Sequence, residues 1–397
     1  MATVSDRINA LAPSATLAMS QKSNELKAQG VDVINLSVGE PDFNTPDHIK
    51  EAAKKAVDEN FSFYTPVPGY LSLRKAVSDK LKNENNLDYA PEQIVVGNGA
   101  KHALCNAIMA LVNPGDEVVI PTPAWVSYMQ MVILAGGENV LVPTTLHTNF
   151  KVSPEQLEAA ITEKTRLVIL CSPSNPTGSI YNKEELKGLA EVIERHENVM
   201  VIADEIYEHI NYVGVHQSLA QFESIKDRIV IINGVSKAYA MTGWRIGYIA
   251  APTWVAKAVT KLQGQFTSGA SSIAQKAAEA AYNGSQECVE VMRKAFMRRR
   301  DLIVGLMKEI PGIQINVPDG AFYLFPEVSS FFGKRYGDTV INDANDLAMF
   351  LLLEGHVATV SGDAFCCPGY LRLRYATCDE NLVVAARRIK ETLAKLQ

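Results

Sequence analysis

The chain has 397 residues, of which 47% are hydrophobic and 21% charged, the ordinary balance of a folded globular protein. This composition excludes a disordered chain, a collagen-like repeat and a small disulfide scaffold, and a chain of this length can bury a large core. The formal net charge of −6 gives no sign of a general affinity for nucleic acid or for anionic lipid.

Two further features bear on location and on metals. The polar first residues lack the apolar core of a signal peptide, and no apolar run approaches the ~18 residues of a membrane span. We therefore expect a cytoplasmic protein that binds neither membranes nor nucleic acid. The six cysteines show no Cys-x-x-Cys spacing, which predicts reduced, mostly buried thiols and no metal site.

Short β-branched runs alternate with longer amphipathic stretches from residue 46 to about residue 280. Several of the runs are almost continuously apolar, which is typical of a parallel sheet covered by helices on both faces. The pattern predicts an α/β large domain over residues 46–283. We expect strands at 93–96, 117–120, 138–142, 167–171, 199–203, 229–233 and 246–250, with helices between them, for instance at 100–111, 154–161 and 183–195.

The C-terminal part has a different pattern. A long charged helix at 286–309 ends at Pro311 and Gly312. We expect a strand at 321–325, a helix at 345–353, strands at 357–360 and 371–376, and a final helix from residue 379. Residues 284–397 are thus predicted to form a smaller α+β domain together with residues 1–45. The absence of a flexible linker indicates that the two domains pack closely and leave a ligand-binding cleft between them.

A lysine and an arginine follow one of the buried strands. Lys237 stands just after strand 229–233, and Arg245 comes eight residues later, flanked by Trp244 and Gly247. A lysine that is desolvated at a strand end has a lowered pKa and suits Schiff-base chemistry, whereas a glycine-flanked arginine suits a phosphate group. For either residue alone, a surface lysine or a packing arginine is the simpler interpretation.

An acid pair, Asp204 and Glu205, ends another apolar strand, where open α/β sheets carry functional groups. Asp204 follows the strand directly, so we expect it to be less exposed than Glu205 and able to face a cationic ring nitrogen. Tyr207 lies three residues further on. Taken alone, a helix N-cap is the simpler role for Asp204.

A glycine-rich turn joins a strand to a helix at residues 96–103. Free backbone N–H groups and the helix dipole suit such a turn to binding a phosphate. The segment half-resembles a dinucleotide-binding fingerprint, but His102 stands at the third glycine position and no companion acid follows a second strand. A nicotinamide dehydrogenase is therefore not favoured.

Together these segments resemble the class I/II aminotransferases, which are pyridoxal-phosphate enzymes of fold type I. The resemblance covers essentially the whole chain and is closest to the prokaryotic aspartate aminotransferase branch. It implies a mostly parallel seven-stranded sheet and a transaminase, with aspartate and 2-oxoglutarate favoured as the substrates of a ping-pong exchange. The motifs that carry it are Pro-Ser-Ala-Thr at 13–16, Gly-Glu-Pro-Asp-Phe at 39–43, Ser-Pro-Ser-Asn-Pro-Thr-Gly at 172–178, Asp-Glu-Ile-Tyr at 204–207, Ser-Lys at 236–237, Gly-Trp-Arg-Ile-Gly at 243–247 and Gly-Ala-Phe-Tyr at 320–323.

The resemblance implies a role for each residue around the cofactor ring. Lys237 corresponds to the lysine that forms the internal aldimine and moves the proton between the substrate Cα and the cofactor. Asp204 keeps the pyridine nitrogen protonated, so that the ring acts as an electron sink. Tyr207 and Asn175 hydrogen-bond the phenolic oxygen of the ring. Trp125 corresponds to the aromatic residue that stacks on the ring, although a core tryptophan is its simpler interpretation.

The same resemblance implies how the cofactor phosphate is held. Its ligands are expected in one cluster: Arg245, Ser236, Gly99, Ala100 and Lys101. Tyr64 corresponds to a tyrosine that reaches the phosphate in the neighbouring subunit. This correspondence implies a homodimer with shared active sites.

The substrate's α-carboxylate is implied to meet Arg372, aided by Gly39, Asn175 and Trp125, because a bidentate guanidinium pair orients a buried carboxylate. The chain departs from the family pattern at Arg374, where relatives carry a small polar residue. Strand alternation places both arginines on one face, so Arg374 either competes for the carboxylate or pairs with an acid.

Substrate choice depends on Lys101. In the branch that the chain resembles, a lysine after the phosphate turn meets the distal carboxylate of aspartate or glutamate, and Ser14 and Thr16 close over it. The alternative is an exposed lysine in the first helical turn, where the helix dipole disfavours a positive charge. That unfavourable placement itself indicates an anionic partner.

Three other functions are compatible with the fold. A lyase or decarboxylase would carry the same cofactor anchors, and another transaminase of the branch would act on prephenate, an aromatic or a different amino acid. A non-catalytic cofactor-binding module of a transcription regulator is disfavoured, since such regulators carry a winged DNA-binding domain before this fold.

Overall fold

A seven-stranded sheet organises the larger part of the molecule in the computed structural model, which describes residues 4–397. Its strand order is β2-β8-β7-β6-β5-β3-β4. β8 runs antiparallel to both of its neighbours, and every other pair is parallel. The strands are β2 (Ile94–Gly97), β3 (Glu117–Thr122), β4 (Glu138–Pro143), β5 (Thr165–Cys171), β6 (Met200–Asp204), β7 (Ile229–Gly234) and β8 (Gly247–Ala250). The predicted mostly parallel sheet is confirmed, with every strand end within two residues of its predicted position.

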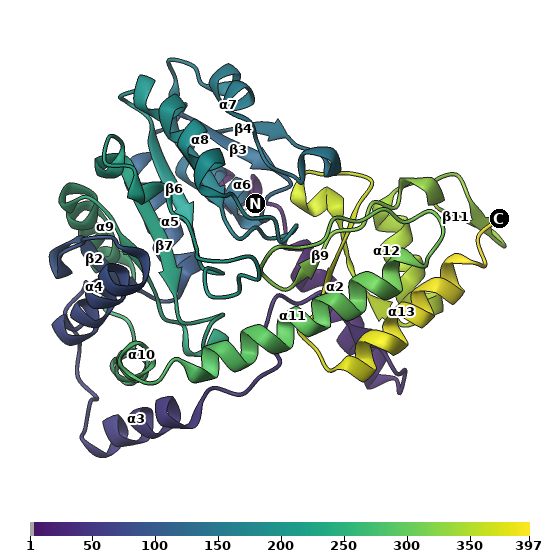
Figure 1. The fold of residues 1–397 in the computed structure, drawn as a ribbon, viewed down its shortest axis with the longest axis horizontal. Helices are drawn as coiled ribbons and strands as arrows, with labels where there is room; N and C mark the ends of the chain where they lie inside the picture. The colour runs from purple at the N-terminus through teal and green to yellow at the C-terminus, as the bar shows by residue number, and fades with distance from the viewer. Residues whose placement is uncertain (1–3) are drawn as a thin grey trace.

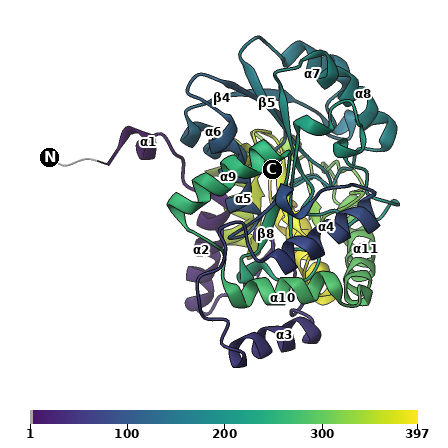
Figure 2. The same ribbon diagram turned by 90° about the vertical axis from the view of Figure 1, so that its left-hand side faces the viewer.

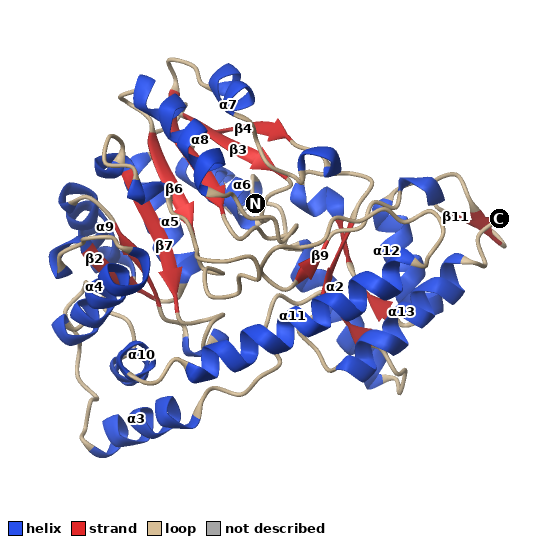
Figure 3. Ribbon diagram, in the orientation of Figure 1, coloured by secondary structure: helices blue, strands red, loops and turns tan. Residues whose placement is uncertain are grey.

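Helices cover both faces of this sheet, as Figures 1 and 3 show. Successive residues of a strand enter different cores, because side chains alternate between the two faces. Val118 packs with α5 (Ala100–Leu111), α6 (Ser127–Ala135) and α9 (Thr253–Phe266). Val119 packs on the opposite face. The helices of that face are α3 (Asp47–Asp58), α4 (Leu71–Asn85), α7 (Pro154–Ala160), α8 (Lys183–Arg195) and α10 (Ser272–Asn283).

The smaller region combines the two ends of the chain. β1 (Ile34–Asn35) pairs in parallel with β12 (Val357–Ala358), and β14 (Leu371–Arg374) lies between β13 (Val360–Ser361) and β9 (Tyr323–Leu324). A hairpin of β10 (Arg335–Tyr336) and β11 (Thr339–Val340) is separate from both sheets. The helices here are α2 (Ala15–Ala28), α12 (Ala344–Gly355) and α13 (Asp379–Leu393), whereas the short helix α1 (Asp6–Asn9) lies next to α6 of the larger part. The domain limits at residues 45/46 and 283/284 stay a prediction.

The long helix α11 (Glu287–Lys308) runs from the larger part into the smaller one (Figure 1). Its residues Met292 and Phe296 share a core with Tyr207, which follows β6, and with Leu371 of β14. The two parts are therefore packed together close to the ends of the sheet strands. Figure 2 shows α1 projecting from the body of the molecule.

The sequence predictions on membrane spans and on cysteines can be compared with the structure. Across residues 4–397, no helix is both long and apolar enough to cross a membrane. All six cysteines are free, as predicted, but the expectation of mostly buried thiols is wrong. Five are only partly buried and Cys378 is exposed. The cytoplasmic location stays a prediction.

Candidate active site

A cavity of 340 Å³ lies where the carboxyl ends of β5, β6 and β7 meet the smaller region. Open α/β sheets bind ligands at this edge, because the loops that follow parallel strands converge there. The lining includes most of the residues singled out from the sequence: Ser14, Thr16, Gly39, Ala100, Lys101, Trp125, Asn175, Asp204, Tyr207, Ser236, Lys237, Arg245 and Arg372. Segments far apart in the sequence thus meet at one site.

Lys237 occupies the turn after β7, and its Nζ donates a hydrogen bond to the carbonyl oxygen of Gly39 at 2.6 Å. Burial lowers the pKa of Lys237 to about 8, because a low-dielectric site disfavours the charged amine, although the carboxylate of Glu40 opposes the shift. The neutral fraction of the amine at neutral pH is therefore larger than for an exposed lysine, and an amine nucleophile or base requires the neutral form.

Asp204 ends β6, and its carboxylate is held from two sides. The hydroxyl of Tyr128 donates to Oδ2 at 2.6 Å, and the backbone N–H of Ile206 donates to Oδ1 at 3.3 Å. Burial raises the pKa of Asp204 to about 6, and the hydrogen bond from Tyr128 opposes the rise. A carboxylate that is buried, oriented and largely ionised at neutral pH suits a cationic ring nitrogen.

Two expectations about the acid pair need correction. No helix follows β6 directly, since the next helical turn is at residues 219–221, so Asp204 is not a helix N-cap. The prediction that Asp204 is less exposed than Glu205 is wrong, because the two are 5% and 3% exposed. Both carboxylates are therefore enclosed.

Arg372 on β14 is the buried cation of the cavity, at 2% exposure. Its Nη1 donates to Oδ1 of Asn175 at 3.0 Å and its Nη2 to the carbonyl oxygen of Ser37. Within residues 4–397 its Nε has no hydrogen-bond partner, and no carboxylate is among the groups that act on the guanidinium. A buried guanidinium with neutral partners and a free N–H fits a carboxylate ligand.

Arg374, the departure from the family pattern, does not line the cavity. Its Nη1 donates to the carbonyl oxygen of Glu40 at 2.8 Å and its Nε to that of Asn35 at 3.4 Å. Neither sequence alternative holds for the described residues, because Arg374 faces backbone carbonyls instead of a carboxylate. It holds the segment that also supplies Gly39 to Lys237.

The predicted phosphate turn has the required shape. Gly99 has φ +89° between β2 and α5, and a Cβ there would lie 2.3 Å from Nη2 of Arg245. Only glycine allows this approach, which directs the guanidinium to the N-terminus of α5. His102, at the third glycine position, accepts a hydrogen bond from the backbone of Asn98 through Nδ1 at 3.0 Å. Together with Ser236 in the lining, these groups fit a phosphate.

Trp125 forms one wall of the cavity and is only partly buried, so the core interpretation does not hold. The Nζ of Lys101 lies 4.7 Å from the centroid of its ring. Desolvation of its ammonium group lowers the pKa of Lys101, and the nearby Arg245 adds to the effect. Lys101 is an exposed residue in the first turn of α5, as the alternative interpretation expected, and it also lines the cavity, as do Ser14 and Thr16.

Sequence reasoning missed two tyrosines of the site. The hydroxyl of Tyr323 lies 2.7 Å from that of Tyr207, and the Tyr323 ring centroid is 4.7 Å from the guanidinium carbon of Arg372. Tyr128 orients Asp204. Both had a local signal: Tyr323 ends the Gly-Ala-Phe-Tyr motif, and Tyr128 follows Trp125 by three residues.

One predicted site residue lies elsewhere. Tyr64 does not line the cavity and is 98% exposed, next to Phe63 at 81%. Within one chain, Tyr64 therefore has no contact with the site. Large exposed aromatic side chains of this kind are typical of surfaces that bind another protein.

The comparisons with known proteins cover the whole chain. The family model for aminotransferase class I and II matches residues 31–389. The chain is 48% identical to the aspartate/prephenate aminotransferase of Cereibacter sphaeroides, over 100% of both chains. It is also 48% identical to the bifunctional aspartate aminotransferase and glutamate/aspartate-prephenate aminotransferase of Petunia hybrida, over 99% of this chain and 83% of that protein.

Solved structures show the same likeness. The aspartate aminotransferase of Rhizobium meliloti matches with a TM-score of 0.97 and 41% identity, over 100% of both chains. The Thermus thermophilus aspartate aminotransferase with maleate matches with a TM-score of 0.92 and 41% identity, over 99% of this chain and 100% of that chain.

Proposed function

The chain belongs to the class I and II aminotransferases, and we propose that it transfers the amino group between aspartate and 2-oxoglutarate, with pyridoxal phosphate bound in the 340 Å³ cavity. The proposal rests on the arrangement of three ionisable side chains. Lys237, Asp204 and Arg372 converge on this cavity, and neutral partners orient all three, although Asp204 and Arg372 are buried and Lys237 is partly buried.

The cofactor, when bound, supplies an electron sink for the electron pair left at the substrate Cα. Asp204 is the partner of the ring nitrogen, because its carboxylate is the buried anion that Tyr128 orients. Tyr207 and Asn175 serve the phenolic oxygen, and Trp125 covers the ring. The phosphate takes the remaining cluster: Arg245, Ser236 and the turn at Gly99, Ala100 and Lys101.

Lys237 is the residue that does the chemistry. Its Nζ would hold the cofactor, and as a free amine it would move the proton at the substrate Cα. The lowered pKa of about 8 supports both roles, since each requires a neutral amine. The Gly39 carbonyl that now accepts its hydrogen bond keeps the amine directed into the cavity.

Two cations fit a dicarboxylic substrate. Arg372 takes the α-carboxylate with Asn175 and Gly39 beside it, and Lys101 takes the distal carboxylate, with Ser14 and Thr16 at the cavity edge. The relatives that are named for both aspartate and prephenate support prephenate as a second acceptor, because it also carries two carboxylates.

The experiment that tests this proposal is a panel of amino acids and 2-oxo acids, with single-turnover conversion of the bound cofactor as the readout. We expect aspartate, glutamate and their oxo acids to convert it much faster than alanine or phenylalanine. Conversion by no donor would indicate a binding module. Release of CO₂ or an eliminated group from aspartate, without cofactor conversion, would indicate a decarboxylase or lyase.

The exposed Tyr64 supports a homodimer in which each chain completes the site of the other. Mixing Lys237→Ala chains with Tyr64→Phe chains tests this. If Tyr64 acts across the interface, the hybrid contains one site with both native residues and regains near-native activity per site. If Tyr64 serves its own chain, or none, the hybrid gains nothing over the separate variants.

A further inference from the structure

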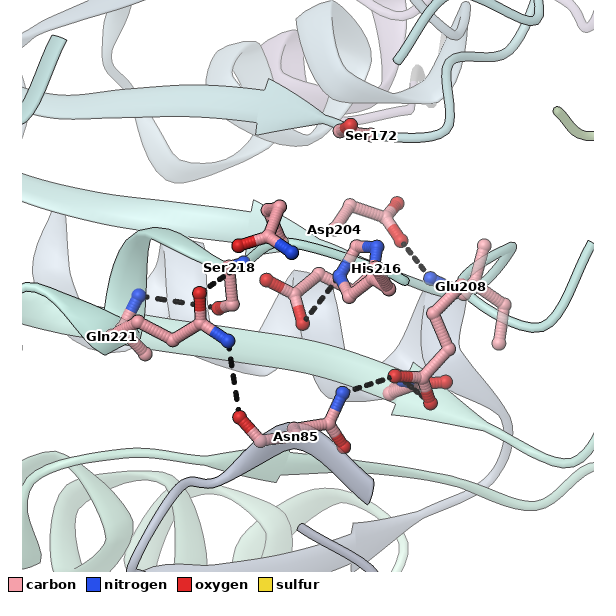
Figure 4. A network of polar contacts seen from close by, with 12 residues as sticks. Asn85, Ser172, Asp204, Glu208, His216, Ser218 and Gln221 are labelled. Atoms are coloured by element: carbon pink, nitrogen blue, oxygen red, sulfur yellow. Dashed lines mark hydrogen bonds and ion pairs between the residues drawn. The ribbon is translucent and has the colours of Figure 1, made fainter. Parts of the chain in front are cut away.

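Four buried charged side chains lie behind the segment that carries Asp204 and Tyr207. We call Lys80, Glu205, Glu208 and His216 the buried quartet; they are 5%, 3%, 6% and 8% exposed. Lys80 comes from α4, the two glutamates follow β6, and His216 lies in the loop beyond. Figure 4 shows Glu208 and His216 between the strand that carries Asp204 and Asn85 at the end of α4.

Glu208 is fully satisfied by donors. Lys80 forms an ion pair with its Oε1, to which Asn233 also donates at 2.8 Å, while Asn85 donates to Oε2 at 2.8 Å. One ligand atom each of Glu205, Glu208 and His216 lies within 4.8 Å of the others, a spacing that a metal ion could use. Both oxygens of Glu208 already accept hydrogen bonds. The ammonium group of Lys80 therefore supplies the positive charge that a metal ion would otherwise bring.

Glu205 depends on His216 alone. The His216 Nε2 lies 3.2 Å from Oε2 of Glu205, an ion-pair distance, and in residues 4–397 neither ring nitrogen nor this carboxylate oxygen has a hydrogen-bond partner. Burial by itself would lower the pKa of His216, but the charges of Glu205 and Glu208 outweigh it and the pKa is raised. In its imidazolium form, which this shift favours, His216 compensates Glu205 as Lys80 compensates Glu208.

The quartet and the active site share one short segment. Asp204 and Tyr207 face the cavity, whereas Glu205 and Glu208 face the quartet. The charged or titratable groups that act on Asp204 are Tyr128, Cys171 and Lys237 on the cavity side and Glu205 on the other. Of these, Glu205 is the carboxylate, and its charge raises the pKa of Asp204 in addition to the larger effect of burial, so its compensation changes the negative charge that Asp204 experiences.

We propose that His216 and Lys80 are positioning residues, which neutralise the carboxylates behind Asp204 so that Asp204 carries the net negative charge of this segment into the cavity. The proposal deepens the proposed function, since it rests on the role of Asp204 there. It predicts that removing the charge of His216 and removing the charge of Glu205 change the proton affinity of Asp204 in opposite directions. Removing the His216 charge leaves Glu205 uncompensated and raises the proton affinity of Asp204, whereas removing the Glu205 charge lowers it.

The test is a titration of Asp204 in the cofactor-free full chain, followed by NMR of ¹³C-labelled aspartate carboxyls and assigned with Asp204→Asn. Starting from a pKa of about 6, we expect His216→Gln to shift the titration upward and Glu205→Gln to shift it downward. Each shift should be about one pH unit, as for a unit charge within roughly 10 Å at an effective dielectric constant of ~20. The double variant, which removes both charges, should titrate near the native value.

The matched control is the partly exposed pair of His196 and Glu158, 2.9 Å apart, whose variants His196→Gln and Glu158→Gln should leave the titration unmoved. Shifts of equal sign, or none, in the His216 and Glu205 variants would overturn the proposal, and so would a metal ion copurifying with the quartet. If a single variant fails to fold, the sign of the remaining one decides. Because the titration needs no cofactor, its result is independent of whether the proposed transamination is observed.

Discussion

Two groups of buried charges lie on opposite sides of the segment that follows β6, and they are compensated differently. On the cavity side, Lys237, Asp204 and Arg372 are held by a backbone carbonyl, a tyrosine hydroxyl and an amide oxygen. On the other side, the charges of the buried quartet face opposite charges: Lys80 faces Glu208 and also Glu84, Glu205 faces His216, and His209 lies 3.5 Å from Glu208. Neutral partners orient a charge without cancelling it, so the cavity side retains charge for a ligand, whereas the charges of the quartet are compensated by ion pairs.

This difference predicts which substitutions affect turnover and which affect the stability of the fold. An uncompensated buried charge costs free energy of folding, and a protein retains it where a ligand repays that cost. Substitutions on the cavity side should therefore affect turnover more than folding, and substitutions in the quartet should do the reverse. Four variants rank these effects on turnover, from the largest to the smallest.

Asp204→Ala should have the largest effect. Without the carboxylate, the ring nitrogen of the cofactor loses its anionic partner, and we expect turnover to fall about 10³-fold, the upper end of the loss from removing one preorganised contact. The measurement is the single-turnover rate with aspartate at saturating cofactor, with cofactor content checked by absorbance. Turnover within a factor of ten of the native rate would show that Asp204 does not serve the cofactor.

Arg372→Ala should reduce kcat/KM for every amino acid. All of them present an α-carboxylate, and truncating one partner of a buried charge pair costs about 2–5 kcal/mol, which centres the expected loss near 300-fold. The measurement compares aspartate, alanine and phenylalanine in the same variant. A loss confined to aspartate would instead assign Arg372 to the distal carboxylate.

Lys101→Ala should affect dicarboxylic substrates selectively. A charge-assisted hydrogen bond is worth about 1.5–3 kcal/mol, so kcat/KM for aspartate should fall roughly 10- to 150-fold. The half-reaction of alanine serves as the internal control and should change far less. Equal losses for both amino acids would return Lys101 to the phosphate cluster and remove the residue-level support for aspartate.

Lys80→Met should have the smallest effect on turnover and a large one on stability. It leaves Glu208 buried and unpaired, which should lower the free energy of unfolding by about 3–5 kcal/mol in urea denaturation. Lys54→Met is the matched control, because it breaks the exposed ion pair with Glu51, which solvent screens, and should leave the free energy of unfolding almost unchanged. Similar losses in the two variants would contradict the compensation that we infer for the quartet.

The sequence predicted elements well where the signals are local. The helices α5 and α8 have the predicted bounds, because a glycine at φ +89° precedes α5 and Asn182 with Glu185 forms a capping box at α8. The predicted strand 321–325 is shorter, since Ala321 has φ +55° and leaves the extended conformation. The predicted strand 357–360 divides in two because β12 and β13 pair in different sheets.

Within the candidate site, too, the features that the sequence predicted are those with a local signal. Lys237, Asp204 and the Gly99 turn could be found because each follows a strand, and strand ends have a sequence signature. The contacts that orient them join residues far apart in the chain: Tyr128 lies 76 positions from Asp204, and Lys80 lies 128 positions from Glu208. Such pairings follow from the packing of the whole fold, so no local pattern reveals them.

The role of Lys237 is tested most directly by finding the residue to which the cofactor is attached. Protein purified with pyridoxal phosphate is treated with borohydride, which fixes the cofactor on the amine that holds it, and is then digested and mapped by mass spectrometry. We predict one modified peptide, with the label on Lys237, and none in Lys237→Ala. A label on any other lysine of the native chain, or a protein that takes up no label, would contradict the central claim that this cavity is the catalytic site.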